Sequence, residues 1–422
     1  MTVAPRFQHQ DGVLHAENIP LTQLARDYGT PLYVYSRQAL RDAWESYRVA
    51  SENRNVLVCF GMKANSNLAV LNEFKELGSG FDIVSGGELA RVLAVGGDAS
   101  RIVFSGVGKQ TWEMQAALKA GVKCFNVESE SELLRLSKVA QDMGVQAPVS
   151  LRVNPDVDAH THPYISTGLK ENKFGIAIEA APEVYALAAT LPNLDIVGVD
   201  CHIGSQITEV SPYLDALDKL LSLVEALASQ GIKLRHLDLG GGIGIRYTDE
   251  TPLSPTMLLD AVFEALQAHN LEHLQIVLEP GRSLVGNAGI LLTKVEYLKH
   301  SPAKNFAIVD AAMNDLIRPT LYDAWHSVEA VVPRPQAEAP RSYDIVGPIC
   351  ESGDWLARDR AFHLEQDDLL AIMSAGAYAF TMSSQYNSRP RPAEVMVDGN
   401  DVHVVRPRET LDSLFDTERV LP

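Results

Sequence analysis

Short apolar runs rich in β-branched residues alternate with helical patterns along the first two thirds of the chain. Several runs are apolar at nearly every position, which is typical of parallel strands covered on both faces. The pattern predicts eight strands, at residues 55–60, 80–85, 101–106, 123–128, 149–154, 196–203, 234–240 and 274–279.

Helical patterns lie between most of these strands. The clearest follows Ser211 and Pro212, a good cap and first-turn pair, and repeats leucine and valine at helical spacing. Thr111 is expected to cap another helix that runs to Ala120, and residues 37–49 supply a helix before the first strand. The alternation of strand and helix therefore continues through all eight strands.

Eight such units in about 250 residues indicate an α/β fold of the TIM type, a (β/α)8 barrel. A doubly wound sheet is the rival, but it rarely keeps so regular an alternation for eight strands. We place the barrel at residues 36–284.

The pattern changes at about residue 285. Strand-like runs at 289–298, 306–309 and 369–373 are joined by loops that contain proline and glycine, and no long amphipathic helix is evident. We expect a mostly β C-terminal domain, formed by 285–422 together with the β-like segment 1–35.

Composition narrows the class of protein. The 422 residues carry a formal net charge of −18, which argues against a nucleic-acid partner or an anionic membrane surface, although a small cationic pocket remains compatible with it. We find neither a signal-peptide pattern nor an apolar stretch of bilayer length. The cysteines are too widely spaced for a zinc or redox motif, so we expect a cytoplasmic protein; they are Cys59, Cys124, Cys201 and Cys350.

A long polar connection spans residues 154–175 and contains His160, His162 and Pro163. Two histidines that are two residues apart in a loop have no fixed ligand geometry. We therefore interpret this segment as a loop near the active site and predict no metal centre.

In a TIM barrel, catalytic residues come from the carboxyl ends of the strands. Reactive or glycine-rich residues occupy that end of five predicted strands: Lys63; Asp82 and Ser85; His202 to Gln206; Gly240 to Gly242; and Glu279 to Arg282. One such coincidence would mean little, whereas five indicate an active site.

Each residue type has a chemical and a structural interpretation. Lys63 is either a surface lysine or an amine nucleophile for a carbonyl group. His202 is either a satisfied core histidine or a ring that stacks on a flat ligand. Glu279 is either an ion-pair partner of Arg282 or a carboxylate that holds a proton on a pyridine nitrogen. The glycine triplet could form a tight turn or present N–H groups to an anion.

Taken together, the chain resembles the alanine racemase-like barrel decarboxylases that use pyridoxal phosphate (fold type III), and most closely their diaminopimelate-decarboxylating branch. The resemblance covers nearly the whole chain, and it rests on Gly61 to Asn65, Phe81 to Glu88, His202 to Ser205, Gly240 to Gly242, Glu279 to Arg282, Asn314 to Pro319 with Tyr322, Cys350 to Asp354, and Ala375 to Tyr378. Met62 departs from the residues frequent at its position, which puts little in doubt.

The resemblance implies a role for each matched residue. Lys63 and Cys350 are the catalytic residues, with Lys63 covalently linked to the cofactor and Cys350 offered by the partner subunit as general acid. The cofactor pyridoxal 5'-phosphate is expected to contact Lys63, Asp82, His202, Ser205, Gly241, Gly242, Glu279, Gly281, Arg282 and Tyr378. The substrate is expected to contact Arg282, Arg318, Tyr322, Glu351 and Tyr378. A homodimer with shared active sites is also implied.

The expected reaction is decarboxylation of meso-diaminopimelate to L-lysine and carbon dioxide. The arginines suit its distal carboxylate, because a guanidinium can form paired hydrogen bonds with it. Glu351 could meet a distal amine, so decarboxylation of ornithine, arginine or carboxynorspermidine remains the alternative. An inactive homologue or a small pyridoxal-binding barrel is less compatible, because Lys63, Cys350 and a β domain are all present.

Overall fold

The computed structural model describes residues 6–158, 173–334 and 339–422. The chain forms two compact units. One unit is a barrel, made of Trp44–Ile245 and Thr251–Ser283, and the other is rich in β-structure, made of Met1–Ala43, Arg246–Glu250 and Leu284–Pro422. His160 and His162, which we assigned to a loop, lie outside the described residues.

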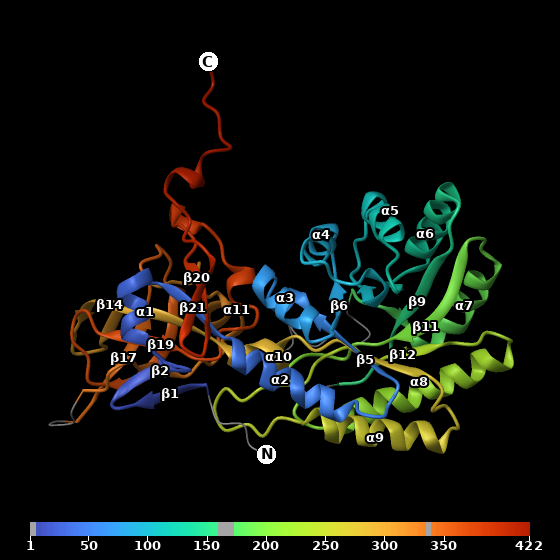
Figure 1. The fold of residues 1–422 in the computed structure, drawn as a ribbon, viewed down its shortest axis with the longest axis horizontal. Coiled ribbons are helices and arrows are strands. Elements are labelled where there is room, and N and C mark those ends of the chain that lie inside the picture. The colour runs from blue at the N-terminus through green and yellow to red at the C-terminus, as the bar shows by residue number, and fades with distance from the viewer. Residues whose placement is uncertain (1–5, 159–172, 335–338) are drawn as a thin grey trace. The chain divides into compact units, whose positions relative to one another are not determined.

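The barrel unit contains a closed ring of eight parallel strands, of which β5, β6, β9, β11 and β12 are labelled in Figure 1. Each strand pairs with the next, and β13 pairs with β5 to complete the ring. The predicted (β/α)8 fold is confirmed, and every predicted strand is present. The strands are β5 Val56–Gly61, β6 Gly80–Ile83, β7 Ile102–Phe104, β8 Cys124–Val127, β9 Ala147–Asn154, β11 Leu194–Asp200, β12 His236–Asp238 and β13 Gln275–Leu278, with a short β10 Ile176–Ala177 beside β9.

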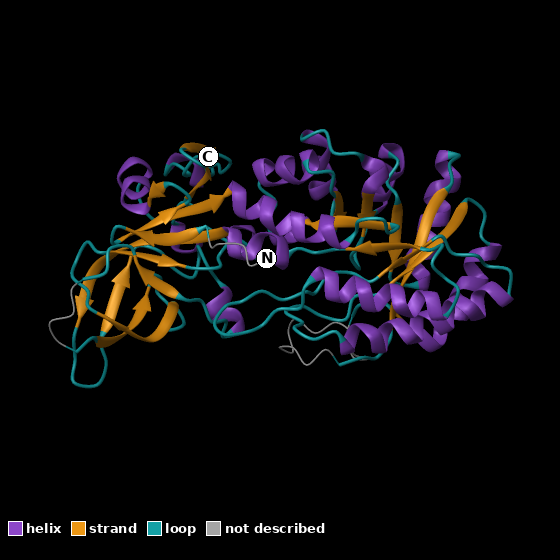
Figure 2. Ribbon diagram, turned by 60° about the horizontal axis from the view of Figure 1, so that its bottom comes forward, coloured by secondary structure: helices purple, strands orange, loops and turns teal. Residues whose placement is uncertain are grey.

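One helix precedes the first barrel strand and the others follow barrel strands, and they pack outside the strands, as Figure 2 shows in purple around the orange strands. They are α2 Arg37–Ala50, α3 Leu68–Glu76, α4 Gly86–Ala94, α5 Thr111–Ala120, α6 Glu130–Met143, α7 Ala181–Thr190, α8 Ser211–Ser229, α9 Pro255–Ala268 and α10 Arg282–Val285. Among the described residues, no helix is long and apolar enough to cross a membrane.

Two helix caps were predicted wrongly by one residue. Ser211 is the first helical residue of α8, and the cap position belongs to Val210, whose side chain can accept no hydrogen bond. Thr111 likewise lies inside α5, where Gln110 forms a capping box with Glu113. The cap moves because Glu113 reaches back to the backbone N–H of Gln110, at 2.8 Å.

The strand register sets which side chains meet at the carboxyl ends. Arg152 on β9 is the register partner of Asp200 on β11, and Asp200 is the partner of Asp238 on β12. Register partners in adjacent strands point to the same face of a sheet. The pairing therefore aligns one guanidinium and two carboxylates in a row inside the barrel.

The β-rich unit contains two sheets. The small one is antiparallel, with β1 Phe7–Gln10, β2 Val13–Ala16 and β3 Ile19–Pro20. The large one contains β4 Leu32–Ser36, β14 Gly289–Lys299, β15 Phe306–Val309, β16 Val328–Ala330, β17 Arg341–Val346, β18 Trp355–Phe362, β19 Leu369–Ile372, β20 Ala393–Asp398 and β21 Asp401–Arg406. The helices of this unit are short, namely α1 Leu21–Tyr28 and α11 Arg318–Tyr322.

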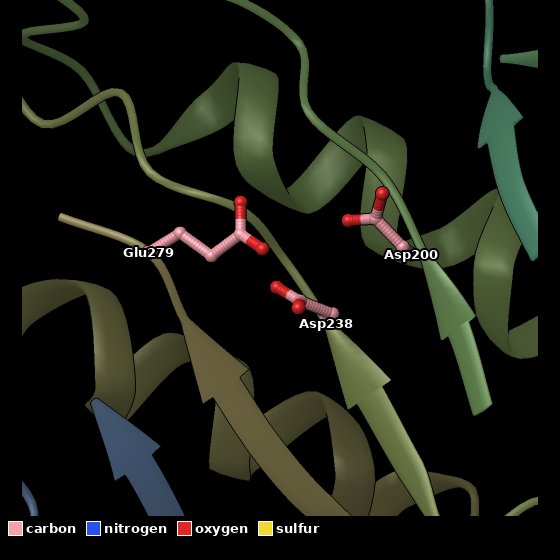
Figure 3. Close-up of side chains that lie close together, drawn as sticks. All are labelled: Asp200, Asp238 and Glu279. Carbon is pink, nitrogen blue, oxygen red and sulfur yellow. The ribbon is translucent and has the colours of Figure 1, made fainter. Parts of the chain in front are cut away.

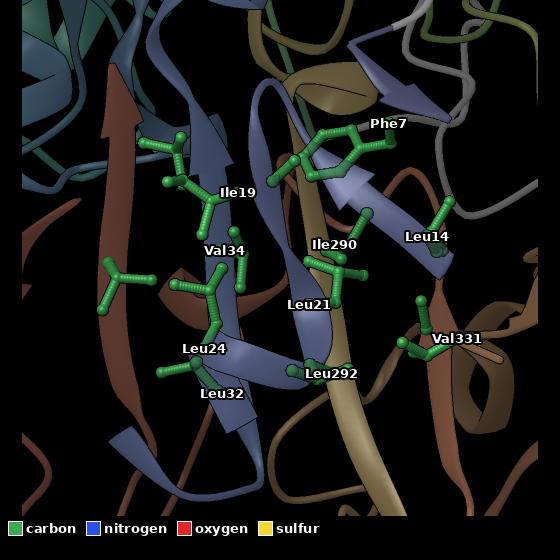
Figure 4. Packing of buried hydrophobic residues seen from close by; sticks show 14 of the residues in the cluster. Phe7, Leu14, Ile19, Leu21, Leu24, Leu32, Val34, Ile290, Leu292 and Val331 are labelled. Carbon is green, nitrogen blue, oxygen red and sulfur yellow. The ribbon is translucent and has the colours of Figure 1, made fainter. Parts of the chain in front are cut away.

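One apolar core unites the N-terminal and C-terminal parts of this unit (Figure 4). Leu24 from α1 and Val34 from β4 pack in the same buried cluster as Ile290 from β14 and Val395 from β20. In the large sheet β4 lies between β14 and β20. This pairing joins the first residues of the chain to strands from its C-terminal part.

Candidate active site

Lys63 lies in a single turn of 3-10 helix, Met62–Ala64, directly after β5. Its Nζ forms an ion pair with Oδ2 of Asp82, which lies on the neighbouring strand β6. Asp82 is completely buried, and its second oxygen has no hydrogen-bond partner within the described part of the chain. The Lys63 side chain is 37% exposed, so its amine is held in place yet remains accessible to a ligand.

The turn after β6 has a structural task. Ser85 is the N-cap of α4 and accepts a hydrogen bond from the backbone N–H of Glu88. The Glu88 carboxylate accepts in return from the backbone N–H of Val84, at 2.6 Å. Burial raises the pKa of Glu88 to about 7, although that hydrogen bond acts in the opposite direction. Part of the family-like motif at 81–88 therefore forms a helix cap.

The glycine triplet follows β12 and has no room for side chains. A Cβ on Gly241 would lie 2.2 Å from the carbonyl oxygen of Glu279, and one on Gly240 would lie 2.6 Å from Nδ1 of His202. Gly242 has a φ of +109°, which side chains disfavour. Only glycine fits at these positions, so the backbone itself forms the surface.

His202 is positioned by the same triplet. Its Nδ1 accepts a hydrogen bond from the backbone N–H of Gly241, at 3.2 Å. Burial holds the pKa of His202 well below its usual value, and the charges of Arg152 and Lys63 lower it further. The ring is therefore neutral at physiological pH, with its proton on Nε2, and is suited to stacking rather than to carrying charge.

Three carboxylates converge from three consecutive strands (Figure 3). Asp200 ends β11, Asp238 ends β12 and Glu279 follows β13, and each offers an oxygen within 4.8 Å of the others. All three are buried, with exposed fractions of 2%, 0% and 7%. Burial and the neighbouring Asp238 raise the pKa of Glu279 well above its usual value. Burial of the cluster therefore favours the protonated form of its carboxyl groups.

Arg282 contacts Ser205, which was also predicted to bind the cofactor. Its Nη2 donates to Oγ of Ser205 at 3.0 Å, and its Nε lies 3.3 Å from the same oxygen. Arg282 is 4% exposed, and Gly281 beside it is also buried.

Sequence reasoning missed the floor of this site. Oε1 of Glu279 lies 3.4 Å from Oγ of Ser105 and 3.5 Å from Nδ2 of Asn126. Asp200 and Asp238 complete the row described above, and neither was predicted. The sequence did contain an indication of these residues. Each is a carboxylate at the end of an otherwise apolar barrel strand, and burying a carboxylate costs free energy unless it serves the site.

The remaining predicted residues belong to the β-rich unit. The Arg318 guanidinium lies 5.8 Å from the ring centre of Tyr247 and 5.6 Å from that of Tyr322. Arg318 is 6% exposed, and one of its nitrogens is 3.4 Å from the Tyr247 hydroxyl. Such stacking holds a guanidinium in one orientation. Arg318 and Tyr322 are thus brought together, and Tyr247 was missed.

Cys350 and Glu351 lie in an exposed turn after β17. The backbone N–H of Cys350 donates to Oδ1 of Asn387 at 2.9 Å, and the hydroxyl of Tyr386 donates to Glu351 at 2.5 Å. Tyr378 has a φ of +53°, a left-handed conformation that costs a non-glycine residue about 1–3 kcal/mol. Strain of this kind commonly accompanies functional positions.

The barrel residues fit pyridoxal phosphate. The side-chain-free triplet provides a surface that a phosphate can approach closely, the accessible amine of Lys63 provides a nucleophile for its aldehyde, and the buried carboxylate of Glu279 suits its ring nitrogen. The fold and these residues define a pyridoxal phosphate-dependent barrel decarboxylase.

Comparison with known proteins agrees with this class. Residues 37–286 match the family described as "Pyridoxal-dependent decarboxylase, pyridoxal binding domain". The predicted cofactor and carboxy-lyase chemistry are thereby confirmed. Over 417 residues the chain is 58% identical to the diaminopimelate decarboxylase of Vibrio cholerae, and over 416 residues it is 60% identical to that of Pseudomonas aeruginosa; each alignment covers 99% of both chains.

Solved structures show the same fold along the chain. Diaminopimelate decarboxylase from M. jannaschii in co-complex with L-lysine has a TM-score of 0.94 and 37% identity, and covers 99% of this chain and 98% of that one. The Helicobacter pylori enzyme complexed with L-lysine has a TM-score of 0.90 and 42% identity, with coverage of 94% and 99%. The chain belongs to the diaminopimelate decarboxylase family.

Proposed function

We propose that the protein decarboxylates meso-diaminopimelate to L-lysine and carbon dioxide, the last step of lysine biosynthesis. The observation that carries this proposal is the similarity of nearly the entire chain, at about 60% identity, to curated enzymes of that name. The L-lysine bound in two similar solved structures is the product that this reaction would release.

The barrel residues supply binding and orientation. Lys63 would hold the cofactor covalently, Asp82 would keep its amine in position, and His202 would lie against the cofactor ring. Backbone N–H groups of the triplet and of the turn that contains Gly281, together with Ser205 and Arg282, bind the phosphate. When bound, the cofactor supplies a ring that accepts the electrons released as the carbon–carbon bond breaks, and Glu279 stabilises the positive charge on its nitrogen.

The β-rich unit supplies most of the proposed substrate contacts, and Arg282 comes from the barrel unit. Arg318, held by two tyrosine rings, binds the distal carboxylate of the substrate, and Arg282 and Tyr322 assist it. Glu351 binds the distal amine and Tyr378 lies beside the phosphate and the substrate. A distal carboxylate is the feature that distinguishes diaminopimelate from ornithine, so Arg318 carries the choice of substrate.

Two measurements test the cofactor and the substrate. Purified protein with pyridoxal phosphate should show an absorption band at the edge of the visible range that is lost in Lys63→Ala. Lys75→Ala is the matched control, because Lys75 forms an ion pair with its neighbour Glu76 on helix α3. Carbon dioxide release from meso-diaminopimelate should far exceed release from ornithine, arginine or lysine. Equal or reversed rates would refute the proposed substrate.

We further propose that Cys350 is the general acid and that a second copy of the chain supplies it, so that the protein acts as a homodimer. Cys350 is exposed, as a residue offered to a partner must be. Cys350→Ala should keep the absorption band and lose turnover by about a hundredfold to ten-thousandfold. Unchanged turnover would assign the proton to another group.

Subunit mixing tests the shared site. Lys63→Ala and Cys350→Ala homodimers should each be nearly inactive. Random reassortment should restore about a quarter of wild-type activity, because half of the dimers are mixed and each then has one intact site. Mixtures that stay inactive after verified exchange would place both residues in one subunit.

The assignment of tasks to the two parts of the chain is also proposed. Residues 36–284 hold the cofactor, and residues 1–35 with 285–422 complete the active site and the dimer interface. We place the protein in the cytoplasm, in keeping with four cysteines that are all free thiols.

A further inference from the structure

The carboxylate cluster contains more acid than the proposed cofactor contacts require. Only Glu279 has a task toward the ring nitrogen, yet Asp238 and Asp200 are buried beside it. Burying a carboxylate without purpose is costly. The two aspartates therefore call for an explanation.

Asp238 differs from Asp200 in its contacts. Oδ1 of Asp238 accepts a hydrogen bond from the backbone N–H of Gly240, at 2.8 Å. Oδ2 of Asp238 is buried and has no hydrogen-bond partner among the described residues. Figure 3 shows the Asp238 carboxylate directed toward Glu279. Oδ1 of Asp200 also has no partner among the described residues, but Oδ2 of Asp200 lies 3.8 Å from Nε of Arg152, a guanidinium that also pairs with Glu128 at 3.2 Å.

These contacts distribute charge unequally. Burial and Asp238 raise the pKa of Asp200 well above its usual value, and the guanidinium of Arg152 beside it opposes that rise. Asp238 and Glu279 face each other without a cation between them, and two close carboxylates in a buried site cannot both ionise. One proton must therefore be held between Asp238 and Glu279.

We propose that Asp238 is a positioning residue that carries this proton and donates it as a hydrogen bond from Oδ2 to Glu279, which fixes Glu279 as the anion that faces the cofactor's ring nitrogen. The inference rests on the proposed cofactor contact of Glu279. When a cationic ring nitrogen lies against Glu279, the proton of the pair resides on Asp238, and no other proton donor or acceptor is required.

The surroundings support a neutral Asp238. Burial raises the pKa of Asp238 to about 7, and the hydrogen bond from Gly240 opposes that rise. The titratable and charged groups that face Asp238 or its partner come from each neighbouring strand: Cys59, Lys63, Asp82, Cys124, Arg152, Asp200, Cys201 and Glu279. The cations in this set lie beside Asp82 and Asp200.

Two substitutions separate a neutral donor from an ionised one. Asp238→Asn preserves shape, keeps a carbonyl that can accept from Gly240, and offers an amide that can donate to Glu279, so it mimics the protonated acid. Asp238→Leu has a similar volume and can do neither. Cofactor affinity, measured by equilibrium dialysis without substrate, is the readout.

We expect Asp238→Asn to bind the cofactor within about threefold of the wild type, and Asp238→Leu to bind it about tenfold to a hundredfold more weakly. Wild-type affinity should weaken as pH rises and Asp238 loses its proton, whereas Asp238→Asn should show a flatter profile. Equal losses in the two variants would mean that an ionised Asp238 is needed and would overturn the proposal. Equal retention would overturn it as well.

A double-mutant cycle separates positioning from folding. In a Glu279→Gln background the charge that Asp238 serves is gone, so the difference in affinity between Asp238→Asn and Asp238→Leu should vanish. A persisting difference would assign Asp238 a purely structural role. If the wild type binds cofactor but does not act on meso-diaminopimelate, only the proposed function fails; if it binds no cofactor, both proposals fail.

Discussion

Replacing Gly241 by alanine tests whether the glycine triplet is the phosphate-binding surface. The added Cβ would lie 2.2 Å from the backbone oxygen of Glu279, whereas ordinary contacts begin near 3.4 Å. The triplet and the Glu279 backbone must therefore separate by about 1.2 Å, the difference between those two distances. Neither neighbour is a flexible side chain that can move aside cheaply.

A displacement of this size should impair function more than folding. Overpacking typically costs about 1–3 kcal/mol of stability, which a barrel of this size can tolerate. A shift of about 1 Å in a binding surface can reduce turnover about a hundredfold. Each lost hydrogen bond to a phosphate should also weaken cofactor binding by about tenfold or more.

Gly87→Ala is the matched control. Gly87 lies in the first turn of α4, at the same end of the barrel, and an added Cβ there would meet only Oγ of Ser85 at an ordinary 3.7 Å. Alanine in a helix should leave cofactor binding unchanged and raise stability by about 0.5–1 kcal/mol. Equilibrium dialysis and carbon dioxide release measure both variants. If Gly241→Ala binds cofactor as well as Gly87→Ala does, the phosphate is held elsewhere.

Two further predictions concern buried charge. Burial lowers the pKa of His236 to about 3, so the unfolded chain takes up a proton first as pH falls below about 6.5. Acidification therefore lowers the free energy of unfolding, by about 2 kcal/mol at pH ~5. Urea unfolding at several pH values should show that His236→Gln lacks this part of the pH dependence. Identical stability–pH curves for the variant and the wild type would contradict the prediction. Arg318→Lys should raise KM for meso-diaminopimelate about tenfold or more and leave KM for ornithine unchanged, because lysine cannot provide paired hydrogen bonds; parallel changes for the two substrates would contradict the assigned contact.

The barrel was predictable because its signals are local and repeated. Each strand is a short apolar run such as 55–60, and each reactive residue follows such a run, which in a parallel barrel places all of them at one end. Lys63 and Glu279 are far apart in sequence, and β13 pairs with β5. The closure of the ring explains how residues from the first and last strands come to form one site.

The residues that were missed depend on register, which the sequence pattern does not specify. Asp200 could be recognised as polar at the end of a strand, but its pairing with Asp238 depends on how β11 and β12 align. A bulge between Ile196 and Gly198 shifts the separate pairing of β11 with β9, and Gly198 also leaves the space that the ring of His236 fills. Such adjustments arise from tertiary packing, so a reading of periodicity cannot anticipate them.

The caps failed for a related reason. Ser211 and Thr111 are good cap residues in isolation, but a capping box needs a partner three residues after the cap. Gln110 has that partner in Glu113. The residue three positions after Thr111 is Met114, which has neither a carboxylate nor an amide to complete a capping box. A cap prediction should therefore weigh the acceptor and the returning side chain together.

The row of charge inside the barrel links the fold to the chemistry. Register aligns Arg152 with Asp200 and Asp200 with Asp238, so within this row the cation lies beside Asp200, while it also pairs with Glu128. Asp238 is one strand further away and must stay neutral or share its proton with Glu279. A cationic ring nitrogen bound against Glu279 would supply the missing positive charge on the far side. Arg152 lies at one end of the row, and Asp238 and Glu279 lie at the other. The far end of the row is therefore suited to a ligand that carries a positive charge.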